Sequence, residues 1–355
     1  MIKKFNTIIL TTIAAFALSL TSCKKDNDET TPVANYSDHI ANATNEVIIK
    51  TYANLNTSAG VLETALATLE ANQTTANLES ARQAWRDARK PWEQSEGFLF
   101  GPVDQQGLDP AMDSWPVNVI DLNNVLSNGT ALTKTYIDGL DGTLKGFHTI
   151  EYLMWGTSGS KLIGDFTARE FEYLTACAQS LKGATNQLHN AWISSGENFA
   201  ANLLTAGASN QFYPSQKAVL QEFVNGMITI ADEVANGKIN DPFSHQNITL
   251  EESRFSANSK TDFADNIRSI YNLYTGSISG SNTKSISTVI QEKNATLDSK
   301  IRSQINTAID AIINIPGTFT TAITANPQAV QNAQDKVRDL LTTLQGDLLT
   351  QINNL

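Results

Sequence analysis

The sequence predicts an all-α protein built from two packed helical bundles. Apolar residues recur at intervals of three, four and seven throughout residues 35–355, as on one face of a helix. The clean alternation of apolar and polar residues that marks a half-buried strand is absent from the sequence. Long amphipathic helices with short connections form bundles. We place the two bundles roughly at residues 35–200 and 201–355.

Composition narrows the class of protein. The chain has 355 residues, of which 41% are hydrophobic and 17% are charged, and it contains 2 cysteines. These values exclude a disordered chain and a disulfide-stabilised scaffold. The net charge is −11 and we find no basic patch, so we expect no nucleic-acid partner.

The N-terminus has the form of a signal peptide. Two lysines at positions 3 and 4 precede an apolar stretch over residues 8–20, which is too short for a stable transmembrane helix. The following Leu20-Thr21-Ser22-Cys23 resembles a bacterial lipobox, in which the cysteine is lipidated. We therefore expect a lipoprotein signal peptide over residues 1–22 and lipidation of Cys23. The alternative is an ordinary signal peptide in which this cysteine is incidental.

A polar, charged segment follows the lipobox and predicts a flexible tether over residues 23–34. Lysine rather than aspartate at position 24 resembles lipoproteins sent to the outer membrane. We expect an outer-membrane lipoprotein whose body faces either the periplasm or the cell surface. The remaining cysteine, Cys177, lies in an apolar helical segment and is expected to be buried.

Four apolar stripes define the clearest helices. We expect Ser259, with Asp262, to cap the helix of the second stripe, and the last two helices to pair in antiparallel fashion across a Pro- and Gly-containing turn. The stripes are Leu78, Ala81, Trp85, Ala88, Trp92 and Leu99; Phe263, Ile267, Ile270 and Tyr274; Ile301, Ile305, Ile309 and Ile312; and Val337, Leu340, Leu344 and Leu348.

Residues 98–116 interrupt the helical pattern. This stretch combines aromatic residues with three prolines and three aspartates, and it cannot be one helix. Long connections of this kind are often functional. An equally good interpretation is a rigid connection whose aromatic side chains cover the end of a bundle.

The segment around His148 is the most informative in the chain. His148 and Glu151 are three residues apart, so their side chains project to the same side of a helix, and both lie within the apolar stripe that contains Leu144 and Trp155. An unpartnered charge would be costly there. A metal ion, a counter-charge or buried hydrogen bonds could satisfy the pair, and His148 and Glu151 could also satisfy each other.

A further ligand is available on the preceding helix. Glu96 lies four residues after Trp92 at the edge of the apolar stripe, and a kink at Pro91 could direct its carboxylate inward. Pro91 could also be a packing bend with no ligand role. Glu93 lies four residues after Arg89, which is more simply interpreted as a solvated or structural ion pair.

The side chains available as metal ligands limit which metal ion the site could hold. The chain has 4 histidines, and we expect surface or capping roles for His39, His189 and His245. The His-Glu-x-x-His motif of zinc hydrolases is absent from the sequence. One imidazole with several carboxylates suits a divalent or trivalent ion such as iron, manganese or calcium, and favours iron over zinc.

Three segments stand out when they are taken together. They are Arg89-Lys90-Pro91-Trp92-Glu93-Gln94-Ser95-Glu96-Gly97-Phe98 with Asp113-Ser114-Trp115-Pro116 behind it; Gly146-Phe147-His148-Thr149-Ile150-Glu151, which has the form Gly-x-His-x-x-Glu; and Glu252-Ser253-Arg254-Phe255-Ser256 running on to Asp262, Asn266 and Tyr274-Thr275-Gly276. Together these segments resemble the imelysin family, of which Gly-x-His-x-x-Glu is a signature. They occur in the family's order and spacing, and the similarity covers nearly all of the chain after the tether.

The resemblance implies an exported protein of two helical bundles with a site at their seam, an association with iron uptake and a classification with metallopeptidases. It makes His148 and Glu151 the signature pair, with Glu96 as the nearest supporting carboxylate. The remaining pocket residues would be Glu93, Asp113 and Trp115 from the first bundle and Arg254 and Ser256 from the second. Some family members carry a histidine after the second bundle's Glu-Ser, and this chain has none there.

Three functions are compatible with these features. We favour a lipid-anchored protein that binds a metal ion or a metal-bearing small ligand in iron acquisition, together with iron-uptake proteins. A metallopeptidase would need a metal-bound water, a base and an open coordination position, for which the sequence supplies few groups. The third possibility is a surface interaction module in which the His148 motif is structural.

Overall fold

Helices make up the regular secondary structure of residues 35–355, the part of the chain that the computed structural model describes. No strand occurs within this range, so the predicted all-α class is confirmed. The predicted signal peptide, Cys23 and the tether lie outside the described residues. Within residues 35–355, no helix is both long and apolar enough to span a bilayer.

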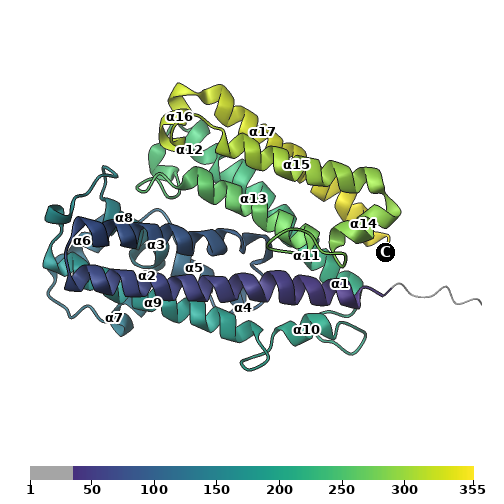
Figure 1. Ribbon diagram of the computed structural model, residues 1–355, viewed down its shortest axis with the longest axis horizontal. Coiled ribbons are helices and arrows are strands. Elements are labelled where there is room, and N and C mark those ends of the chain that lie inside the picture. The colour runs from purple at the N-terminus through teal and green to yellow at the C-terminus, as the bar shows by residue number, and fades with distance from the viewer. Residues whose placement is uncertain (1–34) are drawn as a thin grey trace, which may run out of the picture. The chain divides into compact units, whose positions relative to one another are not determined.

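The first group of helices contains the N-terminal half of the described chain, in purple to teal in Figure 1. α2 packs against α3 and α9, and α8 packs against α3 and α9. The long elements are α2 (Lys50–Ala71), α3 (Thr75–Glu93), α8 (Gly146–Trp155) and α9 (Ala168–Trp192). The short ones are α1 (Ser37–Asn42), η1 (Ala43–Ile49), η2 (Glu96–Phe98), α4 (Pro102–Gln105), α5 (Leu108–Asp113), α6 (Val119–Ser127), α7 (Lys134–Asp138), η3 (Gly142–Leu144), η4 (Ile163–Asp165) and α10 (Ala200–Leu204).

The second group, in green to yellow, packs α13 against α15 and α15 against α17 (Figure 1). The expected pairing of the last two stripes is therefore present, although the short helix α16 lies in their connection. The elements are α11 (Gln216–Asp232), η5 (Glu233–Lys238), α12 (Asn240–Ser244), η6 (Ile248–Leu250), α13 (Ser259–Thr275), α14 (Ile286–Lys293), α15 (Ala295–Ile313), α16 (Phe319–Ala325), α17 (Pro327–Thr343), η7 (Leu344–Leu348) and α18 (Leu349–Asn353).

The two groups meet where α11 and α13 pack against η2, and α13 also packs against α3. The contact is close because it uses glycines on both sides. A Cβ atom on Gly226 of α11 would lie 2.2 Å from the carbonyl oxygen of Gly97, and one on Gly97 would lie 2.7 Å from Oγ of Ser269. This approach brings the end of α3 and the start of α13 together, and the charged side chains described below lie there.

Residues 98–116 form the short helices α4 and α5 rather than an irregular loop. Its first aromatic, Phe98, is fully buried, as expected for a connection that covers the core, and α5 ends at Asp113, which belongs to the charged site. One local expectation needs correction. Ser259 does not cap α13, because Asn258 is the N-cap residue and the Ser259 hydroxyl donates hydrogen bonds to Glu251 and Glu252.

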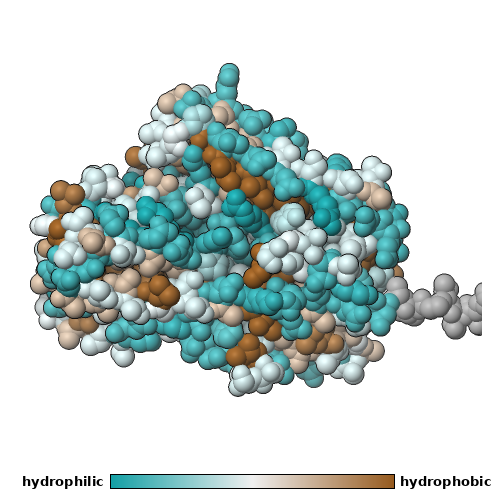
Figure 2. Space-filling view, viewed as in Figure 1, coloured by the Kyte–Doolittle hydropathy of each residue, from teal (hydrophilic) through white to brown (hydrophobic). Residues whose placement is uncertain are grey.

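The interior is a continuous apolar core. All four sequence-predicted stripes contribute to it, and Cys177 is fully buried on α9, as predicted. The large hydrophobic side chains that remain exposed come from separate elements, and the face in Figure 2 is mostly hydrophilic with scattered apolar patches. The unusual feature of this core is the set of charged side chains that are buried in it.

Candidate metal centre

Nine ionisable side chains gather in the interior at the contact between the two helix groups. We call them the charge cluster, and all of them are buried. Its members are Arg89 and Glu93 of α3, Glu96 of η2, Asp113 of α5, His148 and Glu151 of α8, Lys238 of η5, Glu252 and Asp262.

The start of α8 positions the histidine. Gly146 opens this helix with a φ of +75°, and a Cβ atom there would lie 2.2 Å from the carbonyl oxygen of Met112. Only glycine allows both the backbone conformation and this approach to α5. As a result, Nε2 of His148 lies 3.1 Å from Oδ1 of Asp113.

Glu151 fixes the imidazole. Its Oε2 atom lies 3.1 Å from Nδ1 of His148, while its Oε1 atom accepts hydrogen bonds of 2.8 Å from both the backbone N–H and the hydroxyl of Ser256. Both carboxylate oxygens are therefore engaged. A carboxylate that holds one imidazole nitrogen in this way sets the tautomer and leaves the other nitrogen for a metal.

The free nitrogen, Nε2 of His148, is turned toward two carboxylates. Besides Asp113 at 3.1 Å, it lies 3.7 Å from Oε1 of Glu252. Among the described residues it has no partner with hydrogen-bond geometry, although it is buried. An imidazole nitrogen and two carboxylate oxygens thus converge on one position.

Arg89 is the central cation of the cluster. Its guanidinium contacts Asp113 and Glu93, and it lies 2.9 Å from Glu252. The second oxygen of Asp113 accepts a 2.6 Å hydrogen bond from the indole N–H of Trp92. The Glu93 pairing expected from the i, i+4 spacing is present, and it is a buried structural pair rather than a solvated one.

Lys238 enters from the second helix group, at the last position of the π-helical segment η5. Its Nζ atom lies 2.9 Å from Glu96, 3.1 Å from Glu252 and 3.7 Å from Glu93. The side-chain amide of Asn266 on α13 donates hydrogen bonds to Glu93 and Glu96. The cluster is therefore assembled from both groups.

Carboxylates outnumber cations in this cluster. Six carboxylates face Arg89, Lys238 and His148. Burial raises the pKa of Glu93 and of Glu96 well above 4.5, even though Arg89 and Lys238 oppose the shift. Burial therefore favours the protonated form of these carboxyl groups, and an added cation would offset that effect.

The pKa values of the groups around Nε2 shift in opposite directions. Burial would lower the pKa of His148, but the negative charge of Asp113, followed by the contacts with Glu151 and Glu252, raises it well above 6.5. Burial would raise the pKa of Asp113 and of Glu252, but nearby cations lower both: Arg89 first and then His148 for Asp113, and Lys238 first and then His148 for Glu252. These shifts favour a charged imidazole that faces two charged carboxylates.

Two sets of three donor atoms in the cluster could hold an ion, each with its atoms within 4.8 Å of one another. One set is Asp113, His148 and Glu252, and the other is Glu93, Glu96 and Asp113. Carboxylate and imidazole donors fit hard or borderline ions such as iron and manganese. The uncommitted Nε2 atom and the excess of carboxylates both fit a bound cation.

A pocket of about 240 Å³ leads to the cluster. Glu96 and Asp113 line it from inside, and Asp109, Trp115 and Glu233 line it further out. Burial raises the pKa of Asp109 to about 6 and also raises that of Glu233. Four carboxyl groups, those of Glu96, Asp109, Asp113 and Glu233, line this approach to the cluster, and carboxyl groups are suited to attract a cation.

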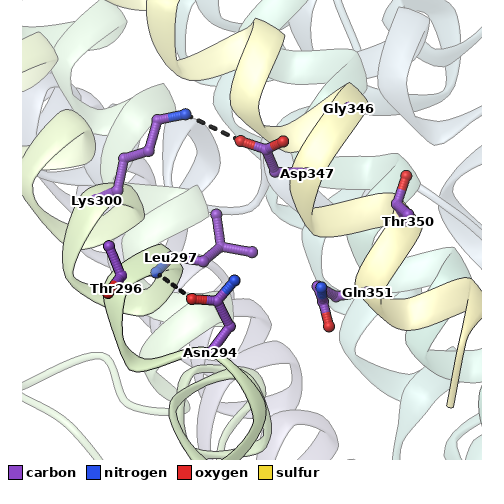
Figure 3. Close-up of a pocket in the computed structure, with 8 residues that line it drawn as sticks. All are labelled: Asn294, Thr296, Leu297, Lys300, Gly346, Asp347, Thr350 and Gln351. Atoms are coloured by element: carbon purple, nitrogen blue, oxygen red, sulfur yellow. Dashed lines mark hydrogen bonds and ion pairs between the residues drawn. The ribbon is translucent and has the colours of Figure 1, made fainter.

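Another pocket, of about 310 Å³, lies between α15 and the C-terminal helices (Figure 3). Lys300 and Asp347 face each other across it at 2.9 Å, and both side chains are about half exposed. This pair is satisfied by solvent and by itself, so we assign no site to this pocket.

Comparison with known proteins places these features in a family. The Imelysin family model matches residues 48–355. The chain belongs to the imelysin family. It is 31% identical over 310 residues to iron-regulated protein A of Synechococcus elongatus, covering 86% of this chain and 83% of that protein.

Solved structures agree with this assignment. A candidate iron-regulated protein A precursor from Parabacteroides distasonis superposes with a TM-score of 0.82 at 27% identity, covering 91% of this chain and 97% of the other. An imelysin-like protein from Psychrobacter arcticum has the same fold, with a TM-score of 0.75 at 12% identity and coverage of 90% and 97%.

In this imelysin, most of the residues selected from the sequence lie together. His148, Glu151, Glu96, Glu93 and Asp113 belong to the charge cluster, and Ser256 binds Glu151. The ring of Trp115 lies beside them, with its centroid 6.0 Å from that of His148. Arg254 differs, because its guanidinium stacks over Phe255 at 4.4 Å and no ion pair within residues 35–355 joins it to the cluster.

Four members of the charge cluster were not identified as site residues from the sequence. Glu252 stood in a quoted motif segment without a role, Asp262 was expected only to help cap a helix, and Arg89 was assigned only to a pair with Glu93. Lys238 has no sequence signal: it follows Asn236-Gly237 in a stretch that predicts a turn, and it reaches the cluster only because η5 continues α11.

Metal-free imelysin is expected to lose stability as the pH rises. Because the folded-state pKa values of Glu93 and Glu96 exceed 4.5, the folded protein binds more protons than the unfolded chain above that pH. Stability then falls with increasing pH, by at most about 1.4 kcal/mol per pH unit for each group. Denaturant unfolding of chelator-treated protein between about pH 5 and about pH 9 measures the slope.

The matched variants are Glu96→Gln, which should flatten this slope, and Glu172→Gln, which should leave it unchanged because the Glu172 side chain is 49% exposed. Stability that is constant or rises over the same range would contradict the assignment of protons to the buried carboxyls.

Proposed function

We propose that this imelysin binds one metal ion in the charge cluster, on Asp113, His148 and Glu252. The observation that carries the proposal is the state of His148. Its Nδ1 atom is held by Glu151, while its buried Nε2 atom lacks a hydrogen-bond partner among the described residues and faces two carboxylates. A bound ion would accept the imidazole lone pair and supply the positive charge that the excess carboxylates lack.

The proposed cargo is iron, and the proposed role is iron acquisition. One imidazole with several carboxylates fits iron better than zinc. The names of the Synechococcus and Parabacteroides relatives, both described as iron-regulated, support the same choice. We propose that lipidation of Cys23 anchors the protein to the outer membrane, facing the periplasm or the cell surface, where it works with iron-uptake proteins.

The size of the pocket favours an ion over a metal-bearing ligand. At about 240 Å³, the pocket that reaches Glu96 and Asp113 is smaller than typical small-molecule sites, which start at about 300 Å³. Six waters of hydration occupy roughly 180 Å³ at about 30 Å³ each. A hydrated ion therefore fits this approach, whereas a bulky chelate would have to remain outside the cluster.

Metal titration of chelator-treated protein tests the proposal. Anaerobic calorimetry with ferrous ion, and parallel titrations with ferric, zinc and calcium ions, should show about one site per chain and the tightest binding for iron. His148→Ala should weaken iron binding by more than about 100-fold and Glu151→Gln by about 10- to 100-fold, since Glu151 only orients the ligand.

The control is His245→Ala, because His245 is exposed and bonds only within its own helix end. It should bind iron like the unmodified protein. Absence of binding, or equal binding by His148→Ala after circular dichroism has confirmed its fold, would refute the proposal. Hydrolysis of unfolded substrates that chelator and Glu151→Gln both abolish would support the metallopeptidase alternative instead.

A further inference from the structure

The charge cluster contains two positions suited to a cation, and they share one residue. Asp113 belongs both to the donor set with His148 and Glu252 and to the set with Glu93 and Glu96. A shared carboxylate is the usual bridge of a two-metal site. The donor atoms alone would therefore allow two ions, so the number bound depends on what else occupies the second position.

Protein cations already occupy the second position. Nζ of Lys238 lies 2.9 Å from Oε2 of Glu96 and 3.7 Å from Oε2 of Glu93. The guanidinium of Arg89 contacts Glu93 and Asp113 from the other side. Each of the three donor residues of this set thus already faces a positive side chain.

The first position differs in one respect. One of its three donor atoms, Nε2 of His148, faces the carboxylates of Asp113 and Glu252 and pairs with no cationic side chain within residues 35–355. Lys238 also approaches Glu252, at 3.1 Å, and therefore lies between the two positions. An ion at the second position would therefore have to displace the ammonium group of Lys238 from Glu96 and Glu93.

The fold holds the Lys238 side chain in a fixed place between the two positions. It is 3% exposed, although lysine is rarely buried unless it is paired, and its Nζ atom lies 5.5 Å from the centroid of the Trp115 ring. The π-helical segment η5 delivers it from the end of α11. π-helical turns of this kind are frequent at functional sites.

We propose that Lys238 acts as a fixed cation that fills the second position and limits the centre to one metal ion. Its ammonium group neutralises Glu93, Glu96 and Glu252, and its charge repels a second metal ion at this short range. The inference rests on the proposed function, since it concerns how many ions the same site accepts.

Replacement of Lys238 by methionine, which has similar length and no charge, tests the inference. We expect the unmodified protein to bind about one Mn²⁺ per chain after equilibrium dialysis and elemental analysis, and Lys238→Met to bind about two. Adding Glu96→Gln to Lys238→Met should return the ratio to about one. Lys300→Met is the control, because Lys300 is exposed and pairs only with Asp347, and it should bind about one.

Electron paramagnetic resonance gives a second measurement. Mn²⁺ in the unmodified protein should give the spectrum of an isolated ion, and in Lys238→Met the spectrum of two coupled ions. A folded Lys238→Met chain that binds one ion or none, while the unmodified protein binds one, would overturn the inference. Binding of neither Mn²⁺ nor ferrous ion by the unmodified protein would instead overturn the proposed function.

If Lys238→Met is unfolded without metal, the inference expects Mn²⁺ to restore the helical circular dichroism spectrum, because the ion supplies the missing charge. Failure of Mn²⁺ to restore the fold would overturn it. Lys238→Arg keeps the positive charge and should bind about one Mn²⁺ ion per chain, whether or not Lys238→Met folds without metal. Binding of two ions per chain by Lys238→Arg would also count against the proposal.

Discussion

Replacing Arg89 with methionine is expected to lower the free energy of unfolding by about 3 to 5 kcal/mol. Methionine fills much of the same volume but leaves buried carboxylates without their shared counter-charge, which is costly in the interior. The affected carboxylates are Asp113, Glu93, Glu252 and Asp262. Denaturant unfolding of chelator-treated protein, followed by circular dichroism, measures the loss.

Arg86 provides the control, since it lies one turn earlier on α3, is half-buried and stacks over Trp155 at 5.0 Å. Arg86→Met should cost less than about 1 kcal/mol. Combining Arg89→Met with Asp113→Asn should recover part of the stability, because both members of one buried pair are then removed. A cost at Arg89 no larger than the cost at Arg86 would contradict the central role of this cation.

The helical class and much of the centre follow from local sequence patterns. Apolar spacing identifies the faces of α3, α13, α15 and α17, since each face only has to match the period of its own helix. The spacing of His148 and Glu151 places them on one side of α8 in the same way. Their position within an apolar stripe correctly indicated that they need buried partners.

The partners themselves could not be predicted in this way. Arg89 and Glu252 are 163 positions apart and meet only because α13 packs against α3. Their contact depends on Gly97 and Gly226, whose missing side chains permit the close approach. Such a requirement becomes visible only when the opposing backbone is known.

Arg89 and Glu93 show a second limit of local reasoning. An arginine and a glutamate four residues apart form the same i, i+4 pair whether that side of the helix faces solvent or another helix. The sequence therefore predicted the ion pair but not its burial. In the fold, the second helix group covers this side of α3, and the pair becomes part of the cluster.

Gly146→Ala is expected to have an effect as large as that of Arg89→Met, by a different mechanism. The φ of +75° at this position is strained for alanine, and the added Cβ atom would lie 2.2 Å from the carbonyl oxygen of Met112. Strain of about 1 to 2 kcal/mol and overpacking of about 1 to 3 kcal/mol give an expected loss of roughly 2 to 5 kcal/mol.

Gly107→Ala separates the two contributions. Gly107 has a similar φ of +61°, but a Cβ atom there would meet no atom within 4 Å. This control should therefore cost only the strain, about 1 to 2 kcal/mol, and leave metal binding unchanged. Gly146→Ala should also weaken iron binding, because the start of α8 must move away from α5 and His148 then leaves Asp113. Equal losses of stability and unchanged iron binding in the two variants would show that the contact with Met112 does not position the histidine.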